Sequence, residues 1–155
     1  MSEQVLQEIR LISEQVTRLM HFELHATATP EEQGILLKFS GPDVDYLLQR
    51  NATVLYALEY VLNRMCSGLL GKDRKITTDA GGFRALREEE LHLIAVKASE
   101  KVLTYGRPVD LQPMPANERR IIHLALRSHP AVTTVSEGEG DNRKVTIVPK
   151  RTEGR

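Results

Sequence analysis

The sequence predicts an α+β protein of two small domains joined by a long helix. At 155 residues with 41% apolar side chains, the chain is long enough for two small hydrophobic cores. Its first part shows helical and strand periodicity in the order helix, strand, strand, helix, helix, strand. A long helical pattern then separates these elements from a second set, a helix followed by two strands. We place the domains at residues 1–80 and 106–155, with the connecting helix at residues 81–105.

The N-terminal elements follow from the spacing of apolar residues. Between Val5 and Leu19 apolar residues recur every three or four positions, which indicates an amphipathic helix. Residues 21–28 alternate strictly between polar and apolar side chains and predict a half-buried strand. A Pro–Gly turn leads to its partner at residues 35–39. We expect two helices next, at about residues 42–48 and 52–65, and a third strand at residues 75–78.

Two glycines precede the long helix, which we expect from Phe83 to Tyr105. Its expected buried stripe is Phe83, Leu86, Leu91, Ile94, Ala98 and Val102. Residues 106–113 are extended and bounded by prolines. A helix starts near Pro115, where proline is tolerated, and ends before Pro130. Strands at residues 131–135 and 143–148 are joined by a glycine-rich hairpin loop at residues 136–142.

The C-terminal helix carries a basic arc with a histidine in its middle. On a helical wheel of about 100° per residue, His123 falls between Arg119 and the pair Arg120 and Arg127. Apolar residues fill the opposite side, so His123 lies outside the predicted core. Arginine planes and imidazoles stack on bases and contact phosphates, which favours a single-stranded nucleic-acid-binding face.

The other basic residues of this region are candidate phosphate contacts. They are Arg120, Arg127, Arg143 and Lys144. The alternative for each is an ordinary solvated surface. The loop at residues 136–142 has two interpretations as well: backbone amides that bind phosphate, or a simple hairpin turn whose three carboxylates repel it.

The signature Arg119-x-x-x-His123, the loop Ser136-Glu-Gly-Glu-Gly140 and the following Arg143 resemble the R-three-H domain, which binds single-stranded nucleic acid. The whole chain resembles the bacterial Jag/KhpB (SpoIIIJ-associated) family, in which a type II KH domain precedes the R-three-H domain. The resemblance implies a cytoplasmic protein that binds single-stranded RNA for post-transcriptional regulation linked to cell elongation and division. It also implies a small KH-only protein as a partner. We expect the chain to lack the family's N-terminal Jag-N module.

A KH domain holds about four nucleotides at a Gly-x-x-Gly loop, whose bare backbone lets phosphates approach a helix N-terminus. At the corresponding place this chain has Gln49, Arg50, Asn51 and Ala52, without glycine and with one positive charge. Two interpretations stay open. Either the KH unit is a scaffold or contact surface, or the altered loop still binds the strand through Arg50.

Charge and cysteine content set further limits. The net charge is zero, but residues 1–105 carry 12 Lys and Arg against 15 Asp and Glu, whereas residues 106–155 carry 9 against 6. The excess of positive charge lies in the part that holds the signature. Cys66 is the single cysteine, which excludes an internal disulfide and fits a reducing compartment. We expect no signal peptide and no membrane insertion.

No pattern indicates catalysis, a metal or a cofactor. His21 and His25 share one face of a strand but have no third ligand at metal spacing. Cys66 has no base at a recognisable spacing, and Gly68 to Lys72 departs from the spacing of a phosphate-binding loop. We therefore expect a binding protein. The rival hypothesis is a protein-interaction module that docks on a partner such as an ATPase, and single-stranded DNA stays open as the ligand.

Overall fold

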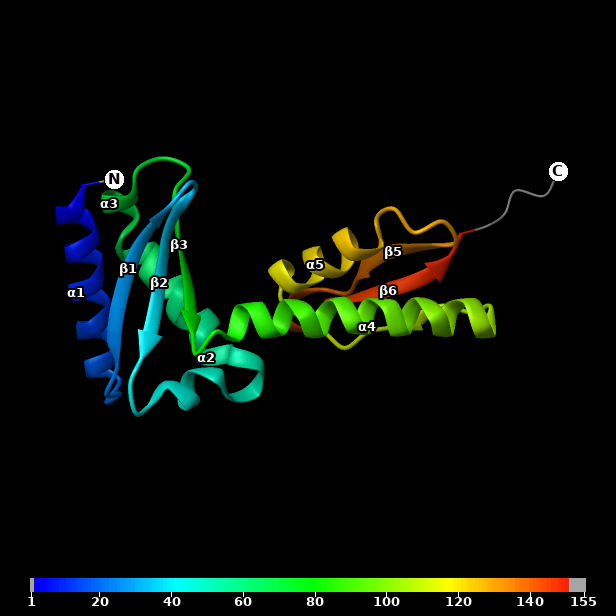
Figure 1. Ribbon diagram of the computed structural model, residues 1–155, viewed down its shortest axis with the longest axis horizontal. Helices are drawn as coiled ribbons and strands as arrows, with labels where there is room; N and C mark the ends of the chain where they lie inside the picture. The colour runs from blue at the N-terminus through cyan, green and yellow to red at the C-terminus, as the bar shows by residue number, and fades with distance from the viewer. Residues whose placement is uncertain (1, 151–155) are drawn as a thin grey trace. The chain divides into compact units, whose positions relative to one another are not determined.

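A computed structural model of the protein describes residues 2–150 and divides the chain into two compact units between Arg84 and Ala85 (Figure 1). The elements of the first unit are α1 (Glu3–Leu19), β1 (His25–Glu31), β2 (Gly34–Ser40), α2 (Val44–Met65), α3 (Ser67–Leu70) and β3 (Lys75–Ala80). The backbone of α2 leaves helical geometry at residues 49–52, which divides α2 into two helical segments. The predicted order of a type II KH-like unit is confirmed.

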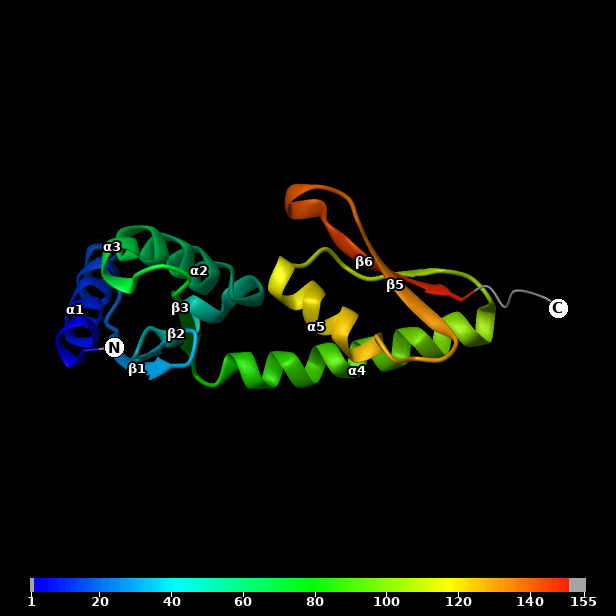
Figure 2. The same cartoon turned by 90° about the horizontal axis from the view of Figure 1, so that it is seen from above.

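The first sheet has the order β1-β2-β3, with β1 and β2 antiparallel and β2 and β3 parallel. Ile35, Leu37 and Phe39 alternate with more exposed neighbours along β2, so one face of the sheet is buried. Helices α1 and α2 cover this face, α1 over β1 and α2 over β3 (Figures 1 and 2). Gly34 is required where the parallel strands approach, because an added Cβ would lie 1.9 Å from the Lys75 carbonyl oxygen.

The first strand lies later in the chain than its alternation predicts. It begins at His25 because His21, with φ of 63°, turns the chain at the end of α1. It also continues through Pro30, which the sequence places in the following turn. Proline is tolerated there because β1 is an edge strand of this sheet.

The second unit begins within the long helix. Its elements are α4 (Phe83–Tyr105, of which the first two residues belong to the first unit), β4 (Val109–Asp110), α5 (Ala116–Leu126), β5 (Val132–Glu137), a 3₁₀ turn η1 (Gly140–Asn142) and β6 (Lys144–Pro149). The strands form an antiparallel sheet of order β4-β6-β5. This three-stranded sheet with helices confirms the predicted C-terminal architecture (Figure 2).

Helix α4 forms one wall of the second core. Leu91, Ala95, Ala98 and Val102 of α4 are buried together with residues of α5 and the sheet. Those partners are Ile122, Leu126, Val132, Val145 and Ile147. The domain boundary expected from the sequence, after residue 105, would separate α4 from this core. The compact units of the structure instead divide between Arg84 and Ala85, which keeps most of α4 with the core.

Several apolar residues of α2 and α4 are exposed, including Leu86 of the predicted buried stripe. Val61 and Met65 of α2 are 42% and 56% exposed, and Leu86 of α4 is 66% exposed. Both helices contain more apolar residues than their buried faces can hold, and a folded surface commonly retains such residues. A helical wheel gives the direction of the buried stripe but not its width.

Candidate nucleic-acid interface

Helix α5 presents its two signature residues to strand β5. Pro115 is extended (φ −60°, ψ 160°) immediately before the helix, and Ile122 and Leu126 anchor α5 in the core. Along β5, Val132 points into the core and Thr134 and Ser136 are half-buried on the same side, two residues apart. The signature residues therefore meet two hydroxyl groups.

His123 is held by both of these hydroxyls. Its Nδ1 lies 2.6 Å from Thr134 Oγ1, and its Nε2 lies 2.8 Å from Ser136 Oγ. The wheel places His123 outside the apolar face, and the ring is half-buried, at the border between the core and the surface. Its orientation is fixed at both nitrogens, so it can present one defined ring face to a ligand.

Arg119 lies one helical turn before His123 and is fixed by the same strand. Its Nε donates to the Met114 carbonyl oxygen at 3.2 Å, and its Nη1 donates to Ser136 Oγ at 3.2 Å. Its Nη2 has no hydrogen-bond partner among residues 2–150. Because the guanidinium is anchored on one edge, the other edge can meet an oxygen of a ligand.

Burial lowers the pKa of His123 below the ordinary histidine value, and the nearby Arg119 guanidinium lowers it further. The basic arc on the helical wheel gives the same direction for the pKa of His123, but it would assign the effect to three arginines. Arg120 and Arg127 are exposed, so water screens their charges. The lowered pKa favours the neutral ring in the free protein.

The structure separates the four candidate phosphate contacts into two groups. Arg120, Arg127 and Arg143 are exposed and form no ion pair with the described part of the chain. Lys144 instead forms an ion pair with Asp110 on the neighbouring strand. This ammonium group and a hydrogen bond from Thr146 lower the pKa of the Asp110 carboxyl.

The loop between β5 and β6 is a tight turn. Gly138 has φ of 86°, and an added Cβ would lie 2.8 Å from the Asn142 carbonyl oxygen, so glycine is needed there. The amides of Asn142 and Arg143 donate to the carbonyl oxygens of Glu139 and Gly140 at 3.1 and 3.2 Å. These two amides are therefore occupied within the turn.

Glu118 and Arg87 form a buried ion pair that sequence patterns did not reveal. Glu118 is 1% exposed and receives two hydrogen bonds from Arg87 of α4, at 3.1 and 2.8 Å. The hydrogen bond to Glu118 raises the pKa of Arg87 above its ordinary value. This bidentate ion pair joins α5 to α4 and fixes the helix that carries Arg119 and His123.

In the first unit, the predicted KH-type loop coincides with the break in α2. Three residues without the freedom of glycine adopt left-handed geometry there: Arg50 (φ 51°), Asn51 (φ 57°) and Ala52 (φ 58°). Left-handed geometry costs about 1–2 kcal/mol for an ordinary residue. Ala52 is fully buried, and Thr53 Oγ1 donates to the Arg50 carbonyl oxygen at 2.7 Å. The chain keeps a sharp loop at this place at a cost in backbone strain.

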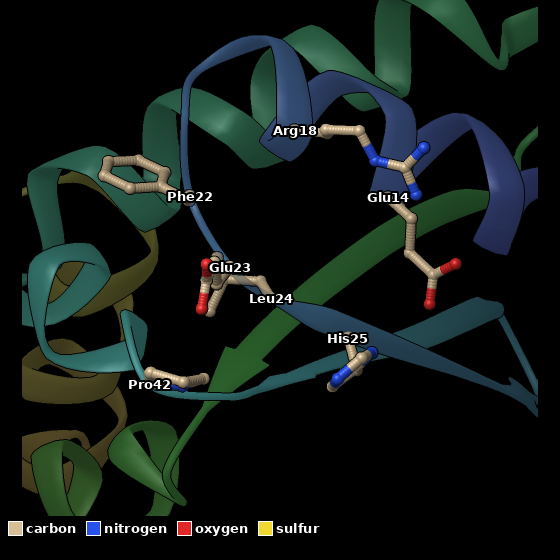
Figure 3. A pocket seen from close by; sticks show the side chains of 7 residues that line it. All are labelled: Glu14, Arg18, Phe22, Glu23, Leu24, His25 and Pro42. Atoms are coloured by element: carbon tan, nitrogen blue, oxygen red, sulfur yellow. The ribbon is translucent and has the colours of Figure 1, made fainter.

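A pocket of about 360 Å³ lies in the first unit where the end of α1 meets the start of β1 (Figure 3). Its lining includes Glu14, Arg18, Glu23 and His25. The Glu14 carboxylate accepts a hydrogen bond from the Ala26 amide at 3.1 Å and forms an ion pair with Arg10 at 3.0 Å. Within residues 2–150 no group of three His, Cys, Asp or Glu side chains could hold a metal ion. In the same range, no helix combines the length and apolar character that a membrane crossing requires.

The helix α5, its Arg-x-x-x-His residues and the adjoining antiparallel sheet define the second unit as an R-three-H domain. The family of this name matches residues 89–149, which include most of α4. The match agrees with the finding that α4 belongs to the second core.

Relatives extend the similarity over nearly the whole chain. The protein named RNA-binding protein KhpB in Bacillus subtilis (strain 168) is 28% identical over 148 residues, which are 94% of this chain and 71% of that protein. The protein of the same name in Clostridium symbiosum is 33% identical over 79% of this chain and 54% of its own length. The protein of this name in Streptococcus pneumoniae serotype 2 is 26% identical over 94% of this chain and 44% of its own length. The chain is therefore similar to KhpB proteins over most of its length, and its second unit carries the R-three-H match.

Proposed function

We propose that this protein binds single-stranded RNA through the face of α5 that carries Arg119 and His123, without catalysis. The observation that supports this best is the shared anchoring of both side chains on Ser136, at 3.2 and 2.8 Å. Groups that are fixed before binding lose little conformational entropy when a ligand arrives. The relatives named RNA-binding protein KhpB make RNA the preferred strand.

In this proposal the exposed arginines of the same unit contact the sugar–phosphate backbone. Arg120 of α5 and Arg127, which caps the end of α5, each lie about one turn from His123, and Arg143 precedes β6. Lys144 would contribute only if it released Asp110. Such contacts supply affinity without reading the base sequence.

For the first unit we propose a scaffold role. The loop at residues 49–52 has no glycine and one positive charge, and Ala52, which stands at the place of its second glycine, is fully buried, so a phosphate cannot approach the backbone at that residue. The predicted small KH-only partner and the predicted cytoplasmic location belong to the same proposal.

A binding titration tests the proposal. The wild-type protein should bind a short unstructured oligouridylate, and Arg119→Met should weaken binding by about 1.5–3 kcal/mol, the value of a hydrogen bond to a charged group. Arg107→Met is the matched control, because Arg107 is exposed in the same unit and lies over Tyr105, away from α5. Equal weakening by both variants would show that Arg119 acts only through net charge.

A further inference from the structure

The hydrogen bonds around His123 limit how many hydroxyl hydrogens of Thr134 and Ser136 are available to a ligand. Arg119 can only donate, so Ser136 Oγ accepts from it. The ring nitrogens of His123 each contact one hydroxyl, that of Thr134 and that of Ser136. Each hydroxyl owns one hydrogen, and its direction depends on whether the facing ring nitrogen carries a proton.

With a neutral ring, one hydroxyl hydrogen is used and one is free. If Nδ1 carries the proton, it donates to Thr134, and Ser136 donates to Nε2, so the Thr134 hydrogen is free. If Nε2 carries the proton, the arrangement reverses and the Ser136 hydrogen is free. When the ring is protonated, both nitrogens donate, and both hydroxyl hydrogens turn away from the ring.

We propose that the hydroxyls of Thr134 and Ser136 bind a phosphate of the strand beside Arg119, and that the charge of His123 sets whether one or both can donate to it. This inference rests on the proposed function and assigns two further binding residues to it. A phosphate offers several acceptor oxygens, so it matches two hydroxyl donors and the unoccupied Nη2 of Arg119. Both hydroxyl side chains are half-buried, which leaves part of each accessible.

Among residues 2–150, no carboxylate competes for this position. On β5, the Glu137 carboxylate is directed to Thr146, with its Oε2 at 3.1 Å from Thr146 Oγ1. On α5, Glu118 is buried against Arg87 of α4, and Arg120 and Arg127 are exposed. On β6, Lys144 is paired with Asp110. In the described part of the chain, the charged group that acts on the ring is Arg119, which favours an anion beside it.

The count predicts a specific pattern for single and double variants. At about pH 8, where the ring is neutral, Thr134→Val should weaken binding of oligouridylate only about twofold, because the tautomer can change and the Ser136 hydroxyl supplies the one free hydrogen. At about pH 6 it should weaken binding about tenfold, because one of two donors is lost. Ser136→Ala also removes the hydrogen bond that anchors Arg119, so its loss should be larger at both pH values and should likewise increase from pH 8 to pH 6. The double variant should lose about tenfold or more at both pH values.

Two further variants separate binding from folding. Thr134→Ser restores the hydroxyl and should restore the wild-type pH profile. Thr133→Val removes an exposed hydroxyl on the opposite side of β5 and should change nothing. In the free protein, ¹⁵N chemical shifts of the His123 ring should report an Nδ1–H tautomer in Ser136→Ala and an Nε2–H tautomer in Thr134→Val.

Equal losses at both pH values for each single variant, or none, would overturn the inference while the proposed function stands. A matched deoxyuridylate strand identifies the group that is bound: equal losses on RNA and DNA support phosphate, and losses on RNA alone would assign the hydroxyls to the ribose and overturn it. A wild-type protein that binds neither strand would overturn both proposals.

Discussion

At the scale of single residues, His123 combines partial burial with two hydrogen-bonded ring nitrogens. Burial lowers its pKa first and Arg119 lowers it second, which favours a neutral ring in the free protein. A phosphate beside the ring favours the protonated form and raises the same pKa. The two effects oppose each other, and their difference appears as a pH dependence of binding.

We predict that RNA affinity rises as pH falls from about 8 toward 6, across the ordinary histidine pKa of about 6.5. The sign follows from linkage, because a group whose pKa is higher in the complex takes up a proton on binding. Affinity levels off above the pKa of the complex and below the pKa of the free protein. Titrations of wild type and His123→Gln at several pH values check this.

Glutamine does not titrate, so His123→Gln should show a flat profile. His123→Ala should weaken binding by about 1–3 kcal/mol if a base stacks on the ring. It should also cost stability on the order of 1 kcal/mol, because two hydrogen bonds to Thr134 and Ser136 are lost. An affinity that rises with pH, or a profile unchanged in His123→Gln, would remove His123 from the site.

At the scale of elements, the Arg87–Glu118 pair fixes α5 against α4. We predict that Glu118→Gln lowers the free energy of unfolding by about 3 kcal/mol, because it removes the buried carboxylate that accepts two hydrogen bonds from Arg87 and leaves this largely buried cation paired with the exposed Glu90. Urea denaturation measures the change. Glu90→Gln is the control: Glu90 also pairs with Arg87 but is 59% exposed, so its loss should cost at most about 1 kcal/mol.

Arg87→Met combined with Glu118→Leu should be less destabilising than the sum of the single variants, because neither charge is then left alone. Additive losses would mean that the two side chains act independently.

The altered loop of α2 allows a test of the scaffold role. Gln49→Gly with Ala52→Gly restores both glycines of the KH motif and relieves the strained φ of 58° at Ala52. If the groove is otherwise intact, this variant should bind RNA more tightly than wild type. Unchanged affinity in the same titration supports the scaffold role, with Gln49→Ala as the control for loss of the glutamine side chain.

Periodicity predicted the elements well because helices and strands repeat their apolar residues locally. It placed α4 correctly from Phe83 to Tyr105, and the wheel found the polar side of α5 that carries His123. It misplaced β1, because the turn at His21 depends on backbone geometry rather than on hydrophobicity. The wheel could not find the partners of His123, since these depend on how β5 packs against α5.

Polar contacts between distant elements were equally hidden. Asn63 of α2 accepts from the Ile76 amide and donates to the Ile76 carbonyl oxygen, both at 2.8 Å, and so covers the edge strand β3. The burial of Glu118 is not visible in the sequence, because a buried carboxylate is rare unless it is paired. Its partner Arg87 lies 31 residues away in the chain. A pattern within one helix contains no information about such a pair.

At the scale of the whole molecule, charge is distributed unevenly on a chain with no net charge. The proposed contacts all lie in the second unit, so binding should depend on a few local arginines. We predict that log affinity falls with log salt concentration with a slope of about −2 to −3, at about −0.7 per phosphate on single strands. Titrations across a salt series measure it. An affinity that does not change with salt would contradict the proposed phosphate contacts, even if RNA still bound through stacking.

The most direct test of the central claim is an amide and imidazole NMR map of the full chain during titration with a short oligouridylate. We predict that the largest shifts fall on residues 119–127 of α5, on Thr134 and Ser136, and on the His123 ring. The loop at residues 49–52 should change little. Large shifts at this loop with an unchanged α5 would contradict the account, because binding would then belong to the first unit.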